Sequence, residues 1–217
     1  MKKSVILFML ALAIVRSDKV KIDDDDVMLD DKEQSKYVTC GSVIKLEHLQ
    51  TKHRLHSHEV TYGSGSGQQS VTGFPEFDDP NSLWQITKFP IGSCKQGTPI
   101  KSGSVVRLMH QTTRRNLHSH NVQSPLSGGQ EVSCFGEQGV GDAGDKWVIE
   151  TASGKGLWKR GDVVYFRHKD TGKYLSASGK HKFGNPIPGQ LEVAAIGSHG
   201  QNTKWSANEG YYFPKRK

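Results

Sequence analysis

An internal repeat constrains the fold of this 217-residue chain more than any other feature of its sequence. Three segments align without a gap: CGSVIKLEHLQTKHRLHSH from Cys40, SGSVVRLMHQTTRRNLHSH from Ser102 and RGDVVYFRHKDTGKYLSAS from Arg160. After each segment the chain reaches a tryptophan at a nearly constant distance, at Trp84, Trp147 and Trp205. A fixed period of this length indicates one supersecondary unit that is used three times.

Each unit contains four short runs that are typical of β-strands. In the first unit they surround Val43 to Leu46, Arg54 to His56, the segment after Gln69, and Trp84. One unit has too few strands to cover its own hairpins, whereas three units close around a common core. We therefore predict an all-β chain, a β-trefoil with pseudo-threefold symmetry, in which six strands form a barrel and three hairpins cap it. An open array of three blades would leave too much apolar surface in water.

The first residues are typical of an export signal. Lys2 and Lys3 precede an apolar run that is shorter than the ~20 residues of a transmembrane helix, so a cleaved signal is preferred to a membrane anchor. Cleavage is expected after Ser17, and Ala11-Leu12-Ala13 offers an earlier site. No later segment is apolar enough to span a membrane. The predicted organisation is a signal peptide at 1–17, an acidic disordered arm at 18–36, a trefoil at 37–213 with repeats at about 37–92, 98–153 and 156–212, and a short basic tail at 214–217.

The charge is divided unevenly along the chain. The formal net charge is +7, of which the signal carries three positive charges and the arm a net −4, so residues 37–217 carry +8. A basic domain can bind acidic proteins, anionic glycans or nucleic acid, and export argues against nucleic acid. A solvated basic surface without a partner stays open as an equal alternative. The four aspartates at 23–26 are interpreted as a solvated run rather than a calcium site.

Three cysteines, Cys40, Cys94 and Cys134, are present. An oxidising compartment favours one disulfide and one free thiol. The pair Cys40 and Cys94 is preferred because these residues lie just before and just after the first repeat, and the other pairings stay open. No Cys-x-x-Cys occurs, which argues against a thioredoxin-like redox site and a zinc knuckle.

The three units resemble MIR motifs, which are named for mannosyltransferases, inositol trisphosphate receptors and ryanodine receptors. The stretches YGSGSGQQSVTG and NLHSHNVQSPLSGGQEVS are similar to the stromal cell-derived factor 2 family, and the resemblance runs from about Tyr37 to Phe213. It implies a β-trefoil in the lumen of the endoplasmic reticulum that binds a lumenal J-domain co-chaperone. It also implies that the protein works beside an Hsp70-class chaperone in the quality control of misfolded proteins. The family is further linked to the unfolded-protein response and to the O-mannosylation of misfolded chains. It implies no catalytic residues.

The end of the sequence departs from that family. Relatives often end in an HDEL-like retrieval tetrapeptide, whereas this sequence ends in FPKRK, from Phe213 to Lys217. Because the receptor-read address is missing, we expect either retention in the endoplasmic reticulum through a partner, or secretion. A truncated or alternative transcript would produce the same ending.

Two Leu-His-Ser-His tetrads form the most specific candidate site. Side chains two positions apart share one face of a strand, so the two histidines of each tetrad converge. A zinc site, a polar ligand pocket, and packing with turn hydrogen bonds all stay open, with packing preferred. The third copy has Ser176 and Ser178 at these positions, and pseudo-symmetry separates the tetrads, so no metal and no cofactor are predicted. The candidate residues for binding a sugar or an acidic peptide are Arg54, His56, His58, Arg115, Asn116, His118 and His120.

The remaining repeated residues are predicted to be structural. The tryptophans are expected core anchors, and His48, His110 and His168 are expected to have a repeated role at a strand end. The tryptophans lack the Gln-x-Trp signature of ricin-like lectins. No Gly-x-Ser-x-Gly elbow and no HExxH motif occurs, so the chain is not expected to be an enzyme. The two hypotheses for function are a subunit of a chaperone complex and a glycan-binding module linked to O-mannosylation.

Overall fold

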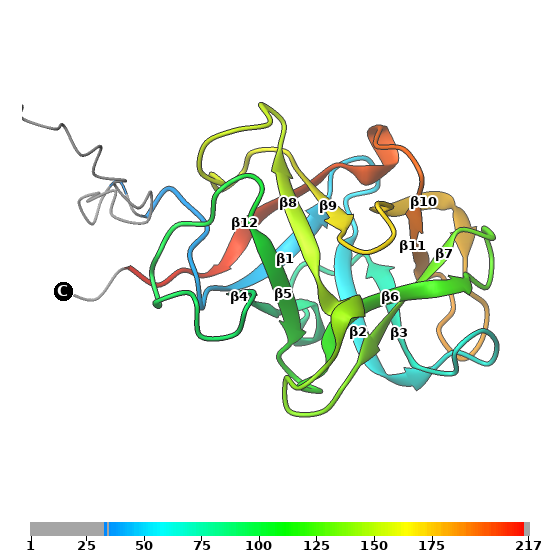
Figure 1. The fold of residues 1–217 in the computed structure, drawn as a ribbon. Helices are drawn as coiled ribbons and strands as arrows, with labels where there is room; N and C mark the ends of the chain where they lie inside the picture. The colour runs from blue at the N-terminus through cyan, green and yellow to red at the C-terminus, as the bar shows by residue number, and fades with distance from the viewer. Residues whose placement is uncertain (1–32, 34, 215–217) are drawn as a thin grey trace, which may run out of the picture.

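A computed structural model describes residue 33 and residues 35–214 of the chain (Figure 1). The expected signal peptide, most of the expected acidic arm and residues 215–217 lie outside the described residues. The described part contains twelve strands and three short 3-10 helices, one before every fourth strand. In chain order these are β1 (Val43–His48), β2 (Arg54–Thr61), β3 (Gln69–Phe74), η1 (Pro80–Ser82), β4 (Trp84–Lys88), β5 (Val105–His110), β6 (Asn116–Gln123), β7 (Gln130–Phe135), η2 (Ala143–Asp145), β8 (Trp147–Thr151), β9 (Val164–His168), β10 (Tyr174–Lys182), β11 (Leu191–Ile196), η3 (Gln201–Thr203) and β12 (Trp205–Tyr211).

Six of the strands form a closed barrel. Every neighbouring pair is antiparallel, and the order around the barrel is β1, β4, β5, β8, β9, β12 and back to β1. The first and last strands therefore meet, with Ile44 opposite Gly210 and His48 opposite Trp205. Closure leaves no barrel strand with a free edge, which is how small antiparallel sheets avoid pairing with other chains.

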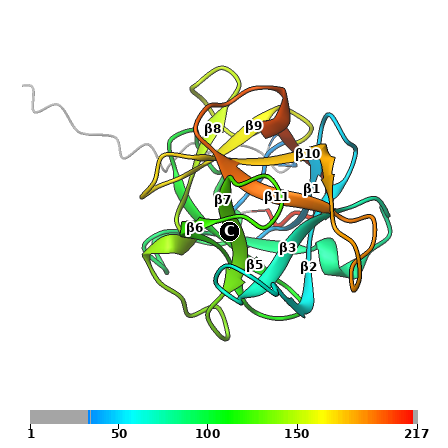
Figure 2. The same cartoon turned by 90° about the vertical axis from the view of Figure 1, so that its right-hand side faces the viewer.

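The other six strands form three hairpins that cap one end of the barrel. The hairpins are β2–β3, β6–β7 and β10–β11, and their inner strands β3, β7 and β11 pair with one another in a triangle. Figure 1 shows the barrel strands on the left and the hairpins on the right, and Figure 2 looks onto the hairpin end. This arrangement confirms the predicted β-trefoil, with four strands in each repeat.

A tryptophan at the start of the last strand of each repeat fills the core. Trp84, Trp147 and Trp205 are fully buried, and each donates its indole N–H to a leucine carbonyl of its own repeat. The acceptors are Leu55 at 2.8 Å, Leu117 at 3.0 Å and Leu175 at 3.0 Å. Buried indoles are usually hydrogen-bonded, and the same pairing of tryptophan with leucine supplies this bond in all three repeats. A fourth tryptophan, Trp158, lies in the same core and packs edge-on against Phe166.

The cysteines are divided as the sequence predicted. A disulfide joins Cys40 to Cys94, and Cys134 is a free thiol that is completely buried in the core. Burial raises the pKa of the Cys134 thiol to about 12, which leaves it protonated and unreactive while the barrel is closed. Within the part of the chain that is described, no helix has the length and apolarity needed to cross a membrane.

Candidate functional site

The two histidines of each tetrad lie side by side on the first strand of a capping hairpin. In β2 the rings of His56 and His58 meet edge to face with centroids 4.9 Å apart, and in β6 the rings of His118 and His120 do the same at 4.9 Å. The alternation of a β-strand places both members of a pair on one face. The outer nitrogens, His58 Nε2 and His120 Nε2, are buried and have no hydrogen-bond partner among the described residues. His120 Nε2 lies 3.5 Å from Glu131 Oε1, so its nearest charged group is the buried carboxylate of its own repeat.

In the first repeat an aspartate holds the inner histidine. Asp79 precedes η1 as its N-cap, and its carboxylate lies 2.7 Å from His56 Nδ1 and 2.7 Å from the hydroxyl of Ser82. Burial lowers the pKa of His56 more than the carboxylate raises it, and burial together with His56 lowers the pKa of His58. Burial opposes ionisation of Asp79, but the hydrogen bonds from Ser82 and His56 outweigh it and lower the pKa of this carboxyl.

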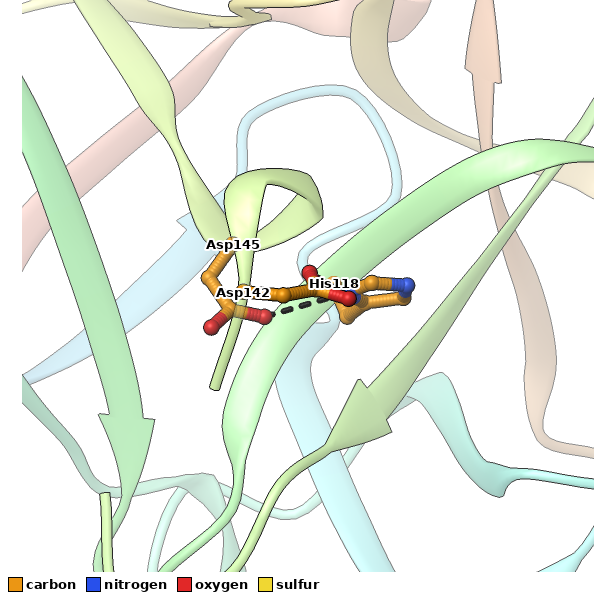
Figure 3. A group of neighbouring side chains, drawn as sticks. All are labelled: His118, Asp142 and Asp145. Atoms are coloured by element: carbon orange, nitrogen blue, oxygen red, sulfur yellow. Dashed lines mark hydrogen bonds and ion pairs between the residues drawn. The ribbon is translucent and has the colours of Figure 1, made fainter. Parts of the chain in front are cut away.

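In the second repeat two carboxylates face the inner histidine (Figure 3). His118 Nδ1 lies 3.0 Å from Asp145 Oδ1 and 3.5 Å from Asp142 Oδ1. Asp145 is completely buried, and its second oxygen accepts a hydrogen bond from Asn116 Nδ2 at 3.2 Å and lies 3.6 Å from Arg107. These ligand atoms of the histidine and the two aspartates lie within 4.8 Å of one another, the only such group among residues 33 and 35–214. Since both oxygens of Asp145 already have protein partners, the group is a hydrogen-bond network that orients His118.

The three other candidate residues lie in different surroundings. Arg54 pairs with Glu209 of β12 at 2.8 Å and with Glu47 of β1 at 3.4 Å. Arg115 is half-buried just before β6, whereas Asn116 is buried and belongs to the Asp145 network. The structure therefore brings Asn116 and His118 together, and leaves Arg54 in a separate cluster of charges.

A second set of histidines joins neighbouring repeats. The strands β1, β5 and β9 end at His48, His110 and His168. Each ring shares a hydrogen bond at Nδ1 with the hydroxyl of the threonine three residues later. At Nε2 each ring bonds the backbone carbonyl of a short helix in a neighbouring repeat, at 2.8 to 3.0 Å. Each also packs on one of the core tryptophans, with centroids 5.0 or 5.1 Å apart. Burial lowers the pKa of His48 and of His110 to about 4.

Several polar residues that hold this region were not indicated by the sequence. Asp79 and Asp145 lie 23 and 27 residues after the histidines that they orient. Glu131 is fully buried and accepts hydrogen bonds from Ser66 in the hairpin loop of the first repeat. The available signal was the pattern of short polar residues before each final tryptophan, which is typical of the N-cap of a short helix.

Comparison with known proteins agrees with the fold and with the resemblance to MIR motifs. The model of the MIR domain family matches residues 55–156. A stromal cell-derived factor 2-like protein of Dictyostelium discoideum is 56% identical over 183 residues, which cover 82% of this chain and 85% of that protein.

Two solved structures are also similar. The crystal structure of an SDF2-like protein from Arabidopsis thaliana superposes with a TM-score of 0.80 at 46% identity, covering 83% of this chain and 99% of that chain. A protein O-mannosyltransferase complex of S. cerevisiae, bound to its sugar donor, matches at a TM-score of 0.73 and 32% identity, covering 84% of this chain but 28% of that one. On its sequence identity to these relatives over most of its length, the chain belongs to the stromal cell-derived factor 2 family.

Proposed function

We propose that this chain is a non-enzymatic subunit of a quality-control complex in the lumen of the endoplasmic reticulum, where it binds a J-domain co-chaperone, misfolded proteins or both. Family membership over 82% of the chain is the observation that carries this proposal. The site geometry supports a binding role, because the inner histidines are held by buried carboxylates within the repeats rather than facing a nucleophile. An Hsp70-class chaperone is the expected further partner in this complex.

The surface offers a candidate contact for a protein partner beside the histidine pairs. Phe77 and Val140 are 66% and 71% exposed, and each lies two residues before the aspartate that caps the short helix of its repeat. Binding residues are often carried by loops that a rigid scaffold holds in place. We therefore expect these two loops to contribute to partner binding.

Affinity purification from microsomes tests the proposal. The tagged full chain is recovered under mild detergent, and mass spectrometry is expected to identify a J-domain protein in stoichiometric amount. Recovery without any J-domain protein or unfolded client would contradict the proposal. The double variant Phe77→Ser with Val140→Ser should reduce recovery of the partner by about tenfold. The matched control is Ile91→Ser, another exposed apolar residue in a different loop, which should leave recovery unchanged.

A second candidate function is glycan binding. It is favoured by the 32% identity to a chain of an O-mannosyltransferase complex, and by the positive charge of residues 37–217. Binding of the purified chain on a glycan array above the level of a heat-denatured sample would support it. Equal signals from the two samples would remove it.

A further inference from the structure

The third repeat lacks the side chains that fill the candidate site in the first two. Ser176 and Ser178 of β10 occupy the places of the histidine pairs, and the short helix η3 begins after Gly200 where the other two begin after aspartate. Two imidazoles and a carboxylate are therefore replaced by two hydroxymethyl groups and a hydrogen atom. Unless the backbone collapses inward, such a change leaves space. The hairpin pairing of Ser176 with Ala194 matches that of His56 with Thr72, so the backbone has kept its register.

A polar bridge between repeats is also missing at this boundary. In the first repeat Gln69 donates hydrogen bonds to Ser57 at 2.7 Å and to Thr113 of the second repeat at 2.9 Å. In the second repeat Gln130 makes the same two bonds, at 2.7 and 3.1 Å, to Ser119 and to Thr171 of the third repeat. The third repeat has alanine and leucine at these places, so no glutamine reaches the corresponding threonine of the first repeat.

A cavity of about 590 Å³ opens where both changes coincide. Its size lies within the range of about 300–1,000 Å³ that is typical of small-molecule sites. All three repeats contribute to the lining, which is partly polar and partly aliphatic. The lining residues are Gln50, Thr51, Ser127, Ser176, Ala177, Ser178, Gly179, Lys180, His181, Glu192, Ala194, Ile196 and Asn202.

A buried carboxylate determines which ligands this cavity favours. Glu192 is 3% exposed and accepts the backbone N–H groups of Leu126 and Ser127 at 2.6 and 2.9 Å. Each carboxylate oxygen has a second lone pair, so the group can still accept hydrogen bonds from a ligand. A negative charge at this depth disfavours anions and favours ligands that donate hydrogen bonds, whether neutral or cationic.

The rest of the lining fits a ligand with several hydroxyl groups. Ser178 offers a hydroxyl, and Gln50 and Asn202 offer amides that can both donate and accept. Between them, Ala177, Ala194 and Ile196 form a small aliphatic floor against which the C–H face of a ring can pack. A basic peptide would satisfy Glu192, but Lys180 at the cavity would repel its charge.

We propose that the cavity of the third repeat binds one neutral sugar residue, with Glu192 accepting its hydroxyl protons. This inference rests on glycan binding, the second candidate function, and assigns it to one place on the trefoil. The histidine pairs of the first two repeats are then the filled counterparts of the same site. The floor has no aromatic ring, so a single sugar should bind weakly, with a Kd of about 1 mM or above.

Saturation-transfer NMR with the full chain and free mannose, glucose or N-acetylglucosamine tests the proposal. Transfer to at least one of these sugars is expected for the parent chain. The variant Ser176→His with Ser178→His and Gly200→Asp rebuilds the arrangement of the first repeat, so it should fold and should lose binding by about tenfold or more. Glu192→Gln removes the negative charge and replaces one acceptor oxygen by a donor amide, so it should weaken binding several-fold.

The outcomes distinguish a failure of glycan binding from a failure of its assignment to this cavity. If no sugar binds the parent chain, both glycan binding and the cavity assignment fail. If a sugar binds but the filled variant binds it equally well, glycan binding stands and the cavity assignment fails. If a lysine-containing peptide binds in the cavity and none of the sugars does, the proposed ligand class is wrong. Circular dichroism and the unfolding midpoint of each variant show that a loss of binding is not a loss of fold.

Discussion

Acid should weaken this fold through the histidines that join the repeats, and His110 offers the sharpest test. The backbone N–H of Thr113 points at its Nδ1 at 3.3 Å, and Nε2 lies 2.8 Å from the Asn81 carbonyl, so the ring is neutral with its proton on Nε2. Burial lowers the pKa of His110 from 6.5 to about 4, although the Asn81 carbonyl acts in the opposite direction. A proton on Nδ1 would also break the bond from Thr113.

The size of the effect follows from the two pKa values. Below about pH 6.5 the unfolded chain binds a proton at this imidazole, whereas the folded chain does not until the pH approaches the value of about 4. Unfolding therefore takes up a proton in this window, and stability is lost as the pH falls. The free energy of unfolding should decrease by about 1.4 kcal/mol per pH unit for this ring, or about 2 kcal/mol from pH 7 to pH 5.

Urea unfolding followed by tryptophan fluorescence, at about pH 7 and pH 5, measures this loss for the parent chain and for His110→Gln. The variant should be less stable at neutral pH, because the packing on Trp84 is disturbed. Its further loss on acidification should nevertheless be smaller than that of the parent chain by about 2 kcal/mol. Ile149→Val, which removes a buried methyl group and no proton site, should lose about 1 kcal/mol equally at both pH values. An identical acid loss in the parent chain and in His110→Gln would refute the argument.

Three further predictions test the core and the site. Trp147→Phe removes the donor to the buried Leu117 carbonyl and should lower the free energy of unfolding by about 2–3 kcal/mol in urea titration; an unchanged midpoint would contradict the role of that bond. Gly144→Ala places a methyl group 2.3 Å from His118 Cε1, so NMR should show a displaced ring and stability should fall by about 1–3 kcal/mol; a native spectrum would be inconsistent with this packing. Cys134 should resist iodoacetamide in the native chain and react only in denaturant, and rapid native labelling would argue against its burial.

The architecture could be predicted because the information for it is repeated. Trp84, Trp147 and Trp205 recur at one spacing, and a unit that cannot bury its own apolar face must share a core with its copies. Local alternation then located the strands, and the position of the cysteines around the first repeat favoured the disulfide that the structure contains. These inferences depend on periodicity and on chain order, which a sequence displays directly.

The candidate site could be predicted from the sequence only in part. Alternation predicted that His56 and His58 share a face, but no local pattern connects His56 to Asp79, which folding brings to 2.7 Å. The grouping of Arg54 with the histidines followed from adjacency along the strand. In the structure its long side chain instead reaches Glu209, 155 residues away, because β12 lies beside β1.

The cavity of the third repeat also could not be predicted from the sequence. The substitution of Ser176 for histidine was visible in the sequence, but it argued only against a metal. Whether smaller side chains leave a hollow or allow collapse depends on packing across repeats, here on Thr51 and Glu192 from distant parts of the chain. Packing among residues that lie far apart in the chain leaves no local pattern in the sequence.

The seam between β1 and β12 has a consequence for how the protein is made. Translation supplies β1 first of the twelve strands, but its partner across the seam, Trp205–Tyr211, is the last of the twelve to be made. Until then β1 and β9 each lack one neighbour, and unpaired strand edges readily associate with other chains. A nascent chain that stops short of Trp205 therefore yields an open, aggregation-prone sheet rather than a smaller folded domain.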